Sequence, residues 1–429
     1  MHASARRVTP LHASALGALA TGLALLLAAC GAGEAEPELA IHTDFEGAGL
    51  GGWEKTDPGT LDLELHTDTE SSHARWYSFR VEGAEGRPLT FRFTNADDVN
   101  ASGAWSYNRP VVSSDGGSTW ERIPETDYED GVFTFQHTPG SEEEWIAYVP
   151  VYNFSRWTDL VERVENDPRV ADVRVIGESL EGRPIHLLRI TDPATADETQ
   201  PALWAVARQH PAETGGSWKA EGLLEWLLSE DPQAQAMLEG GEVYLAGFLN
   251  PDGVTLGNYR VNRAGVNLNR VWDDPDPETE PEVHAVHREM HRFVEDGGEI
   301  SFFVDLHSHS TIRRNFFYWN DAEATSPAMA QEMEAFMARF EEINPDFTKE
   351  GSSGGSTGNE GVAANWAYND LGVHAVTFES AYQDVTYGPY EGEYLTVERL
   401  LALGRDFGRT AAEVLYDESR EEETAAGSR

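Results

Sequence analysis

Cysteine, positive charge and long apolar runs are all scarce in this chain. Only one cysteine occurs among 429 residues, so no intramolecular disulfide can form. Lysine and arginine total 31 against 75 acidic residues, giving a net charge of −44 that is spread over the whole length. Such a surface repels nucleic acid and anionic lipid and argues against both as partners. Beyond residue 29, no segment is long and apolar enough to cross a bilayer.

The one long apolar stretch lies near the N-terminus. Arg6 and Arg7 precede apolar residues 15–29, and the stretch ends Leu-Ala-Ala before Cys30. A run of about fifteen apolar residues is short for a spanning helix and suits a signal peptide. Leu-Ala-Ala-Cys also matches the bacterial lipobox. Residues 1–29 are therefore predicted to be a lipoprotein signal peptide, and residues 30–40 a lipidated cysteine and its tether.

This N-terminus predicts an exported bacterial lipoprotein, periplasmic or at the cell surface and anchored to the outer membrane. Its only membrane contact would be the lipid on Cys30. The alternative is an ordinary secretory leader in which the cysteine is incidental.

Residues 41–150 show the patterning of short β-strands. Apolar residues alternate with polar ones around residues 77–81, 89–93 and 133–135. Residues 83–87 supply a turn between the first two of these segments. Asp115-Gly116-Gly117 is a hairpin signal between Val111-Val112 and Thr119-Trp120. Several short strands at this spacing predict a small antiparallel β-sandwich.

The periodicity of apolar residues changes over residues 151–417, where predicted strands alternate with predicted helices. Strands are expected at 185–190, 202–207, 243–248, 302–306 and 373–378, and helices at 157–165, 217–228, 282–294, 327–342 and 397–415. This order predicts an α/β domain with a mixed central sheet and helices on both faces. The Gly-rich segment 351–361 is expected to be a loop where a lid could sit. Residues 418–429 are charged and expected to be a disordered acidic tail.

Candidate chemical groups fall where these strands are expected to end. His210 and Glu213 follow one strand, His307 follows another, and Glu379 ends a third. Ligands of α/β sheets gather beyond the carboxyl ends of the strands. Two histidines and a carboxylate suffice to hold a catalytic zinc ion, and a second carboxylate can accept a proton from water that the metal activates. Asp305 or a backbone carbonyl could orient the His307 ring.

Two other sets of histidines are alternative candidates for the metal ligands. His309 lies two residues beyond His307 and points the same way on an extended segment, so geometry does not choose between them. His284, His287 and His291 share one face of an expected helix. The segment His287-Arg-Glu-Met-His291 is similar to the H-E-x-x-H zinc motif, but its glutamate is one position out of place. We interpret it as a solvated helix face.

Two arginines and an asparagine lie between the candidate metal ligands. Arg260 ends a segment that begins Asn250-Pro-Asp-Gly, and Asn269 and Arg270 follow shortly after. An arginine beside zinc can stabilise a developing oxyanion. An arginine with an adjacent asparagine can bind a carboxylate, as recognition of a free peptide C-terminus requires.

In these motifs the chain resembles the zinc carboxypeptidase family, which includes carboxypeptidase A. HPAE, NPDG, GVNLNR, DLH and TFE occur in family order between residues 164 and 415. The resemblance implies a mixed α/β fold and one Zn²⁺ held by His210, Glu213 and His307, which favours His307 over His309. It further implies Arg260 as the oxyanion clamp, Asn269 and Arg270 as the carboxylate site, and Glu379 as the general base.

The N-terminal domain predicted over residues 41–150 is similar to the β-sandwich that precedes the catalytic domain of cytosolic carboxypeptidases. Segments at 76–82, 109–120 and 145–150 carry this likeness, and so does Gly-Asn-Tyr-Arg260. Deglutamylating relatives place an arginine at the position of Ala364, so a neutral C-terminal side chain is expected here. The substrate-contacting tyrosine of carboxypeptidase A falls at Thr357, so Tyr382 or Tyr387 is a candidate replacement.

The sequence thus predicts a lipid-anchored metallocarboxypeptidase that acts on peptide or protein C-termini. One alternative is an enzyme that trims cell-wall stem peptides, as an amidase or carboxypeptidase. Another is a non-catalytic peptide-binding lipoprotein on an inherited hydrolase fold.

Overall fold

The computed structural model describes residues 38–416, apart from 99–101, 197–199, 321–326 and 356–357. The predicted signal peptide, Cys30, most of the tether, Thr357 and the tail over 418–429 lie outside the described residues. The described residues belong to one compact unit. Within this part of the chain, no helix combines the length and the apolar character that crossing a bilayer requires.

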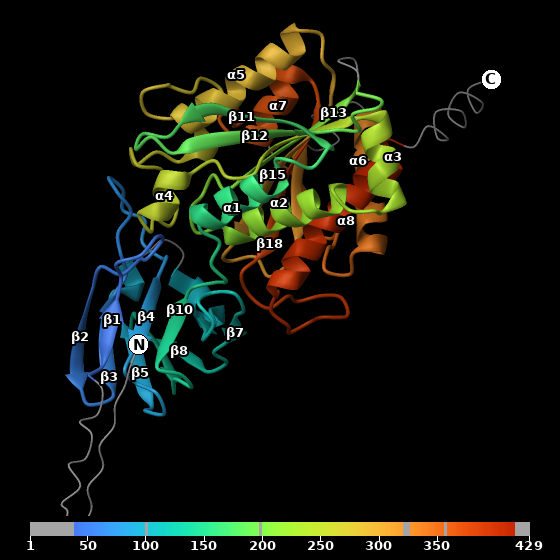
Figure 1. The fold of residues 1–429 in the computed structure, drawn as a ribbon. Coiled ribbons are helices and arrows are strands. Elements are labelled where there is room, and N and C mark those ends of the chain that lie inside the picture. Colours follow the sequence, from blue (N-terminus) through green and yellow to red (C-terminus); the bar gives the residue numbers. More distant parts are fainter. Residues whose placement is uncertain (1–37, 99–101, 197–199, 321–326, 356–357, 417–429) are drawn as a thin grey trace, which may run out of the picture. The chain divides into compact units, whose positions relative to one another are not determined.

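Two five-stranded sheets form the predicted N-terminal sandwich (Figure 1). The first runs, in spatial order, β1 (Ala40–His42), β4 (Ser78–Glu82), β10 (Glu143–Ala147), β6 (Val111–Ser113) and β7 (Glu121–Arg122). The second runs β2 (Gly52–Asp57), β3 (Thr60–Glu64), β5 (Leu89–Phe93), β9 (Val132–His137) and β8 (Thr126–Glu129). Two short 3-10 helices, η1 (Ala96–Asp98) and η2 (Ser102–Tyr107), lie between β5 and β6.

The sandwich differs from the prediction in one pairing. Strands β3 and β5 are parallel, so the sandwich is not wholly antiparallel. The predicted turn over 83–87 is confirmed between β4 and β5, which belong to different sheets. The predicted hairpin is confirmed as β6 and β7, although its second strand begins at Glu121, two residues later than expected.

An eight-stranded mixed sheet forms the centre of the C-terminal domain, as predicted. Parallel pairing joins β14, β13, β15 and β18 in spatial order, and β16 with β17; the remaining pairs are antiparallel. The order is β11 (Val170–Glu178), β12 (Pro184–Ile190), β14 (Glu242–Ala246), β13 (Ala202–Ala207), β15 (Ile300–His309), β18 (His374–Ala381), β16 (Phe316–Asn320) and β17 (Ser353–Gly355).

Helices cover both faces of this sheet because successive side chains on a strand point to opposite faces. On β13, Leu203 and Ala205 pack with one set of helices, and Trp204 and Val206 pack with the other. The first set is α1 (Phe154–Val164), α2 (Thr214–Leu227), α3 (Pro232–Gly240), α6 (Pro327–Ile343) and α8 (Val397–Leu415). The second set is α5 (Pro281–Glu295) and α7 (Ala363–Leu371).

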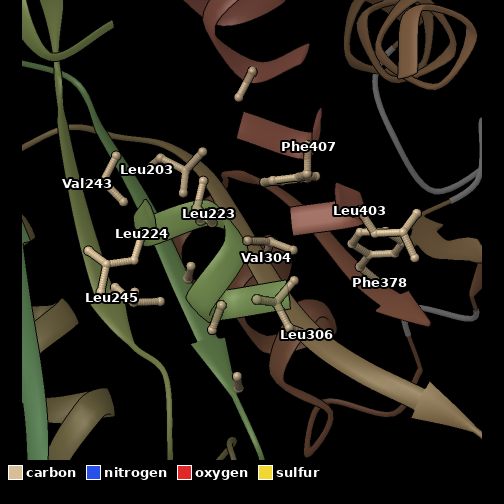
Figure 2. Close-up of a cluster of buried hydrophobic side chains, with 14 of the residues drawn as sticks. Leu203, Leu223, Leu224, Val243, Leu245, Val304, Leu306, Phe378, Leu403 and Phe407 are labelled. Carbon is tan, nitrogen blue, oxygen red and sulfur yellow. The ribbon is translucent and has the colours of Figure 1, made fainter. Parts of the chain in front are cut away.

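The core between the sheet and α2 and α8 is aliphatic and aromatic, as Figure 2 shows. Leu223 and Leu224 of α2 and Phe407 of α8 pack there against Val304 and Phe378 of β15 and β18. This core fixes the strands whose carboxyl ends carry the candidate site. The short α4 (Pro251–Thr255) and η3 (Leu268–Arg270) lie in the connections at that edge.

Both β15 and β18 extend further than the sequence predicted. Their parallel pairing continues through His307↔Glu379 to His309↔Ala381. His307 and Glu379 therefore lie within the last residues of their strands, not beyond them. Neighbouring strands are about 4.8 Å apart, so this register places the two side-chain positions side by side.

Candidate metal centre and active site

A tight turn after β13 presents His210 and Glu213. The Glu213 amide donates to the carbonyl of His210 at 3.1 Å and closes the turn. Arg208 has a φ of 63°, a left-handed conformation that bulky residues seldom adopt. Its buried guanidinium Nε donates to the carbonyl of Pro211 at 2.7 Å and braces the turn from behind.

His210, Glu213 and His307 converge into one buried cluster. Their relative exposures are 4%, 7% and 2%. His210 Nδ1 lies 2.8 Å from one Glu213 carboxylate oxygen, and His307 Nδ1 lies 2.6 Å from the other. One ligand atom from each residue falls within 4.8 Å of the others. This is the group of three that the sequence predicted to hold a metal.

The far ring nitrogen of each histidine faces an oxygen. His210 Nε2 lies 2.9 Å from Asn267 Oδ1, an oxygen that also accepts the Asn269 amide. His307 Nε2 lies 2.7 Å from the Asp305 carboxylate, so the predicted orienting role of Asp305 is confirmed. These contacts turn each Nδ1 toward Glu213, and in a neutral ring the oxygen beside Nε2 favours the proton on that nitrogen.

Burial lowers the pKa of His210 to about 4, so that ring is neutral and its Nδ1 lone pair faces the Glu213 carboxylate. Burial also lowers the pKa of His307, but Asp305 and Glu213 outweigh it and hold the value well above ordinary, so this anionic surrounding favours a positive charge at the His307 ring. A metal cation would supply that charge in place of the His307 proton. Because imidazole nitrogens and a carboxylate are ligands that zinc prefers, the residues present fit a zinc ion.

Glu379 is a buried carboxylate beside this cluster. Among the described residues, its Oε2 atom has no hydrogen-bond partner. Burial and, to a lesser extent, the nearby negative charge of Glu213 raise the pKa of Glu379 to about 8, against the opposing effect of His307 and Lys219. A carboxyl group with such a pKa can both take up and release a proton near neutral pH.

Lys219 lies behind the site and was not singled out from the sequence. It is fully buried on α2, and its ammonium donates to the carbonyls of His307 and Phe378 at 2.7 Å each. It therefore ties together the strand ends that carry His307 and Glu379. Burial lowers the pKa of Lys219 to about 7, while Glu379 and other carboxylates oppose this effect.

A cavity of about 390 Å³ opens onto the cluster. The predicted catalytic residues Arg260 and Glu379 line it, and so do the predicted substrate-binding residues Asn269 and Arg270. Within the described part of the chain, the Arg260 guanidinium makes no hydrogen bond, and that of Arg270 donates only to the carbonyl of Asn269. Burial and the charge of Arg260 lower the pKa of Arg270. Two closely spaced cations at one cavity wall suit an anionic ligand.

The competing histidines do not join the metal cluster. His309 lines the cavity, but its Nδ1 accepts from the amides of Thr311 and Ile312 at 3.1 Å. His287 and His291 are half-buried and pack on Trp366, so their helix face is less solvated than predicted. Neither they nor His284 belong to a metal-binding group among the described residues.

The structure places the two candidate tyrosines away from the cavity lining. Tyr382 is buried against Tyr148 of the sandwich, and the Tyr387 hydroxyl bonds to the backbone of Asn315 and Asp346. Tyr318 of β16 lines the cavity instead. Burial raises the pKa of Tyr318, and so does the charge of Glu379, which lines the same cavity. No sequence motif marks Tyr318, because β16 itself was not predicted.

Two family profiles divide the chain at the boundary between its two parts. Residues 157–393 match zinc carboxypeptidase, and residues 41–149 match the cytosolic carboxypeptidase N-terminal domain. The chain therefore belongs to the zinc carboxypeptidase family, and it retains the His-Glu-His metal-binding triad.

Relatives of known name support this assignment. Cytosolic carboxypeptidase 6 from Homo sapiens is 29% identical, over 85% of this chain and 76% of its own. A metallo-carboxypeptidase from Burkholderia cenocepacia is 28% identical, with a TM-score of 0.81 over 88% of this chain and 99% of its own. A metallo-carboxypeptidase from Pseudomonas aeruginosa, solved with (2-guanidinoethylmercapto)succinic acid, is 31% identical, with a TM-score of 0.79 over the same shares.

Proposed function

We propose that this protein removes single residues from the C-termini of peptides. One observation carries the proposal: a buried His-Glu-His triad opens onto a cavity that two arginines and Glu379 also line, and the Glu379 Oε2 atom has no hydrogen-bond partner in the described part of the chain. When bound by His210, Glu213 and His307, zinc supplies a Lewis acid for the scissile carbonyl and for water.

Glu379 is the proposed general base and acid. Its carboxylate takes a proton from the attacking water and delivers it to the amine of the departing residue. The raised pKa of Glu379, which burial and Glu213 produce, supports this double role because proton uptake and release are then balanced near neutral pH.

Arg260 and Arg270 are proposed to bind the negative charges of the substrate. Arg260 faces the oxygen that becomes negative as the carbonyl is attacked, where a fixed cation favours the transition state. Arg270, with Asn269, binds the free carboxylate of the peptide. The Oδ1 atom of Asn269 already accepts the amide of Ala363 at 2.8 Å, which holds its side chain at the cavity wall.

The cavity is proposed to accept a neutral C-terminal side chain. Val362, Ala364, Ala375 and Thr377 line it. Of its lining residues that the structure describes, the carboxylates are Glu213 and Glu379 and the arginines are Arg260 and Arg270, all with roles already proposed. No further charge is thus available to pair with an acidic or basic side chain.

Cys30 and the preceding leader support a proposed location outside the cytoplasm, with a lipid anchor in the outer membrane. Metabolic labelling with an alkyne-bearing fatty acid should label the wild-type protein and not the Cys30→Ser variant. Equal labelling of both proteins would refute the anchor.

The test of activity is a peptide series with free or amidated C-termini, digested and analysed by mass spectrometry. The wild-type protein should shorten only free peptides, one residue at a time. Glu379→Gln should retain zinc and lose about 10²-fold or more of kcat. Glu225→Gln, which changes an exposed glutamate on α2, is the matched control and should retain activity.

Three outcomes would contradict the proposal. Cleavage of purified muropeptides but not of linear peptides would assign the enzyme to cell-wall stem peptides. Equal, negligible turnover by the wild-type protein and Glu379→Gln, with a full zinc complement, would indicate a peptide-binding protein. Release of internal fragments would indicate an endopeptidase.

A further inference from the structure

A segment of the N-terminal sandwich reaches the loop that carries Arg260. This segment lies between β3 and β4, and its central residue, Asp68, is only 3% exposed. The Asp68 carboxylate accepts three successive backbone amides of the C-terminal domain. One oxygen accepts Tyr259 at 2.6 Å, and the other accepts Arg260 at 2.7 Å and Val261 at 3.2 Å.

Neighbouring residues strengthen the same contact. The Thr69 amide and hydroxyl both donate to Asn258 Oδ1, at 3.2 and 3.3 Å. The Asn258 amide nitrogen in turn donates to the carbonyl of Val261 at 3.0 Å. Glu70 packs so closely on Gly265 that a Cβ atom there would lie 2.8 Å from the Glu70 carbonyl oxygen. The sandwich segment and the Arg260 loop therefore fit together without spare room.

The other side of the loop is tied to the metal-binding turn. The carbonyl of Tyr259 accepts the amide of Ala212 at 3.1 Å, one residue before Glu213. Tyr259 thus receives a hydrogen bond from the metal-binding turn on its carbonyl and donates its amide to Asp68. A continuous chain of hydrogen bonds links the sandwich to the candidate metal centre.

The side chain of Arg260 depends on this backbone for its placement. Among the described residues no hydrogen bond holds its guanidinium, so its position follows from where the loop holds its Cα atom. Burial raises the pKa of Asp68 to about 6, while the three amides and the charge of Arg260 oppose the rise. The carboxyl group is therefore ionised at neutral pH, and both of its oxygens act as acceptors.

We propose that Asp68 is a positioning residue through which the N-terminal sandwich completes the active site. It fixes the backbone from which Arg260 extends into the cavity. This inference rests on the proposed function, because it assumes that Arg260 acts on the transition state. It gives the sandwich a part in catalysis without any contact between that domain and the substrate.

Asp68→Asn is the direct test. Asparagine keeps the shape of aspartate but offers one acceptor oxygen, so its NH₂ group must face at least one of the three amides. We expect kcat to fall by about 10- to 100-fold, as misplaced catalytic groups typically cause. KM for peptides should change by less than about threefold, because Arg270 and Asn269 bind the ground-state carboxylate.

Glu46→Gln is the matched control. The Glu46 carboxylate also accepts backbone amides of the C-terminal domain, from Phe154 at 2.7 Å and Ser155 at 3.2 Å, at the start of α1. It makes the same kind of contact without touching the Arg260 loop. We expect this variant to keep the wild-type kcat even if its melting temperature falls. A fall in kcat equal to that of Asp68→Asn would overturn the proposal, because any interface damage would then suffice.

A double-variant cycle separates positioning from a general loss of structure. If Asp68 acts through Arg260, the double variant Asp68→Asn/Arg260→Ala should be no slower than Arg260→Ala alone. Fully additive losses, or a wild-type kcat for Asp68→Asn, would refute the inference. If Asp68→Asn does not fold, Thr69→Val is a second test. It should lower kcat by up to about fivefold, the effect of one lost hydrogen bond. An unchanged kcat for Thr69→Val would count against the inference. An inactive wild-type protein would instead refute the proposed function.

Discussion

Gly404 permits α8 to lie directly on α2, and its replacement by alanine is the most quantitative test of the packing behind the site. A Cβ atom at Gly404 would lie 1.9 Å from the carbonyl oxygen of Lys219 and 2.7 Å from its carbonyl carbon. A Cβ atom at Gly222 of α2 would lie 2.1 Å from the carbonyl oxygen of Leu401. The two helices therefore touch backbone to backbone at both glycines.

The Gly404→Ala clash cannot be relieved by rotating a side chain, because its neighbours are backbone atoms. The helices must separate by about 1 Å, and such overpacking typically costs about 1–3 kcal/mol. The clash is with backbone, so we expect a cost at the upper end of this range. Alanine regains up to about 1 kcal/mol of helix propensity, which leaves a net loss of about 2 kcal/mol at that upper end. Lys219 belongs to the helix that is displaced, so zinc affinity should fall as well.

Urea unfolding followed by tryptophan fluorescence, with zinc titration in parallel, measures both effects. Gly240→Ala is the control, because Gly240 ends α3 and nothing lies within 4 Å of a Cβ atom there. It should be as stable as the wild-type protein or slightly more so. If Gly404→Ala unfolds at the same urea concentration as Gly240→Ala, the close contact of α2 and α8 is wrong.

Three further outcomes follow from charged side chains. Burial raises the pKa of Glu282 from 4.5 to about 7, so the free energy of unfolding of the wild-type protein should fall by up to about 3 kcal/mol as pH rises from below 4.5 through 7. Glu282→Gln should lack this dependence and should have a higher melting temperature than the wild type at pH 8. A difference in melting temperature between the two proteins that does not grow with pH would contradict this prediction. Lys219→Met should lower the free energy of unfolding by about 2–4 kcal/mol, because two buried carbonyls lose their hydrogen-bond donor. An unchanged melting temperature would show that this lysine is dispensable for stability. Arg270→Ala should raise KM by roughly 10- to 100-fold with little change in kcat, and a loss confined to kcat would remove Arg270 from carboxylate binding.

Sequence patterns located the fold where hydrophobic periodicity is strong. The bounds predicted for β13 and α8 coincide with the observed ones. The edge strand β11 was missed because many of its residues are polar or exposed. The short strand β16 was also missed, because its apolar run over Phe316–Trp319 is only four residues long and does not alternate with polar residues.

The residues that converge at the site were predictable because their motifs reflect local geometry. The turn that carries His210 and Glu213, and the strand ends that carry His307 and Glu379, are each encoded within a few residues. The supporting residues were not predictable in this way. Asn267 lies in the GVNLNR motif, in which only Asn269 and Arg270 were predicted to act. Tyr318 lies at the cavity because of the pairing of β16 with β18, which no single segment of the sequence encodes.

Asp68 and Lys219 illustrate the same limit more strongly. Each acts on a backbone segment that is remote in sequence, so its function depends on tertiary structure alone. The helix that carries Lys219 also contains Glu221 and Glu225, so the sequence gives no sign that this lysine is buried.

Whether His210, Glu213 and His307 share one zinc ion can be measured by anomalous diffraction at the zinc absorption edge, from crystals of the zinc-loaded protein. We expect one strong peak, within about 2.0–2.2 Å of the Nδ1 atoms of both histidines and of a Glu213 oxygen. A peak elsewhere, such as beside His287 and His291, with none at this cluster would contradict it.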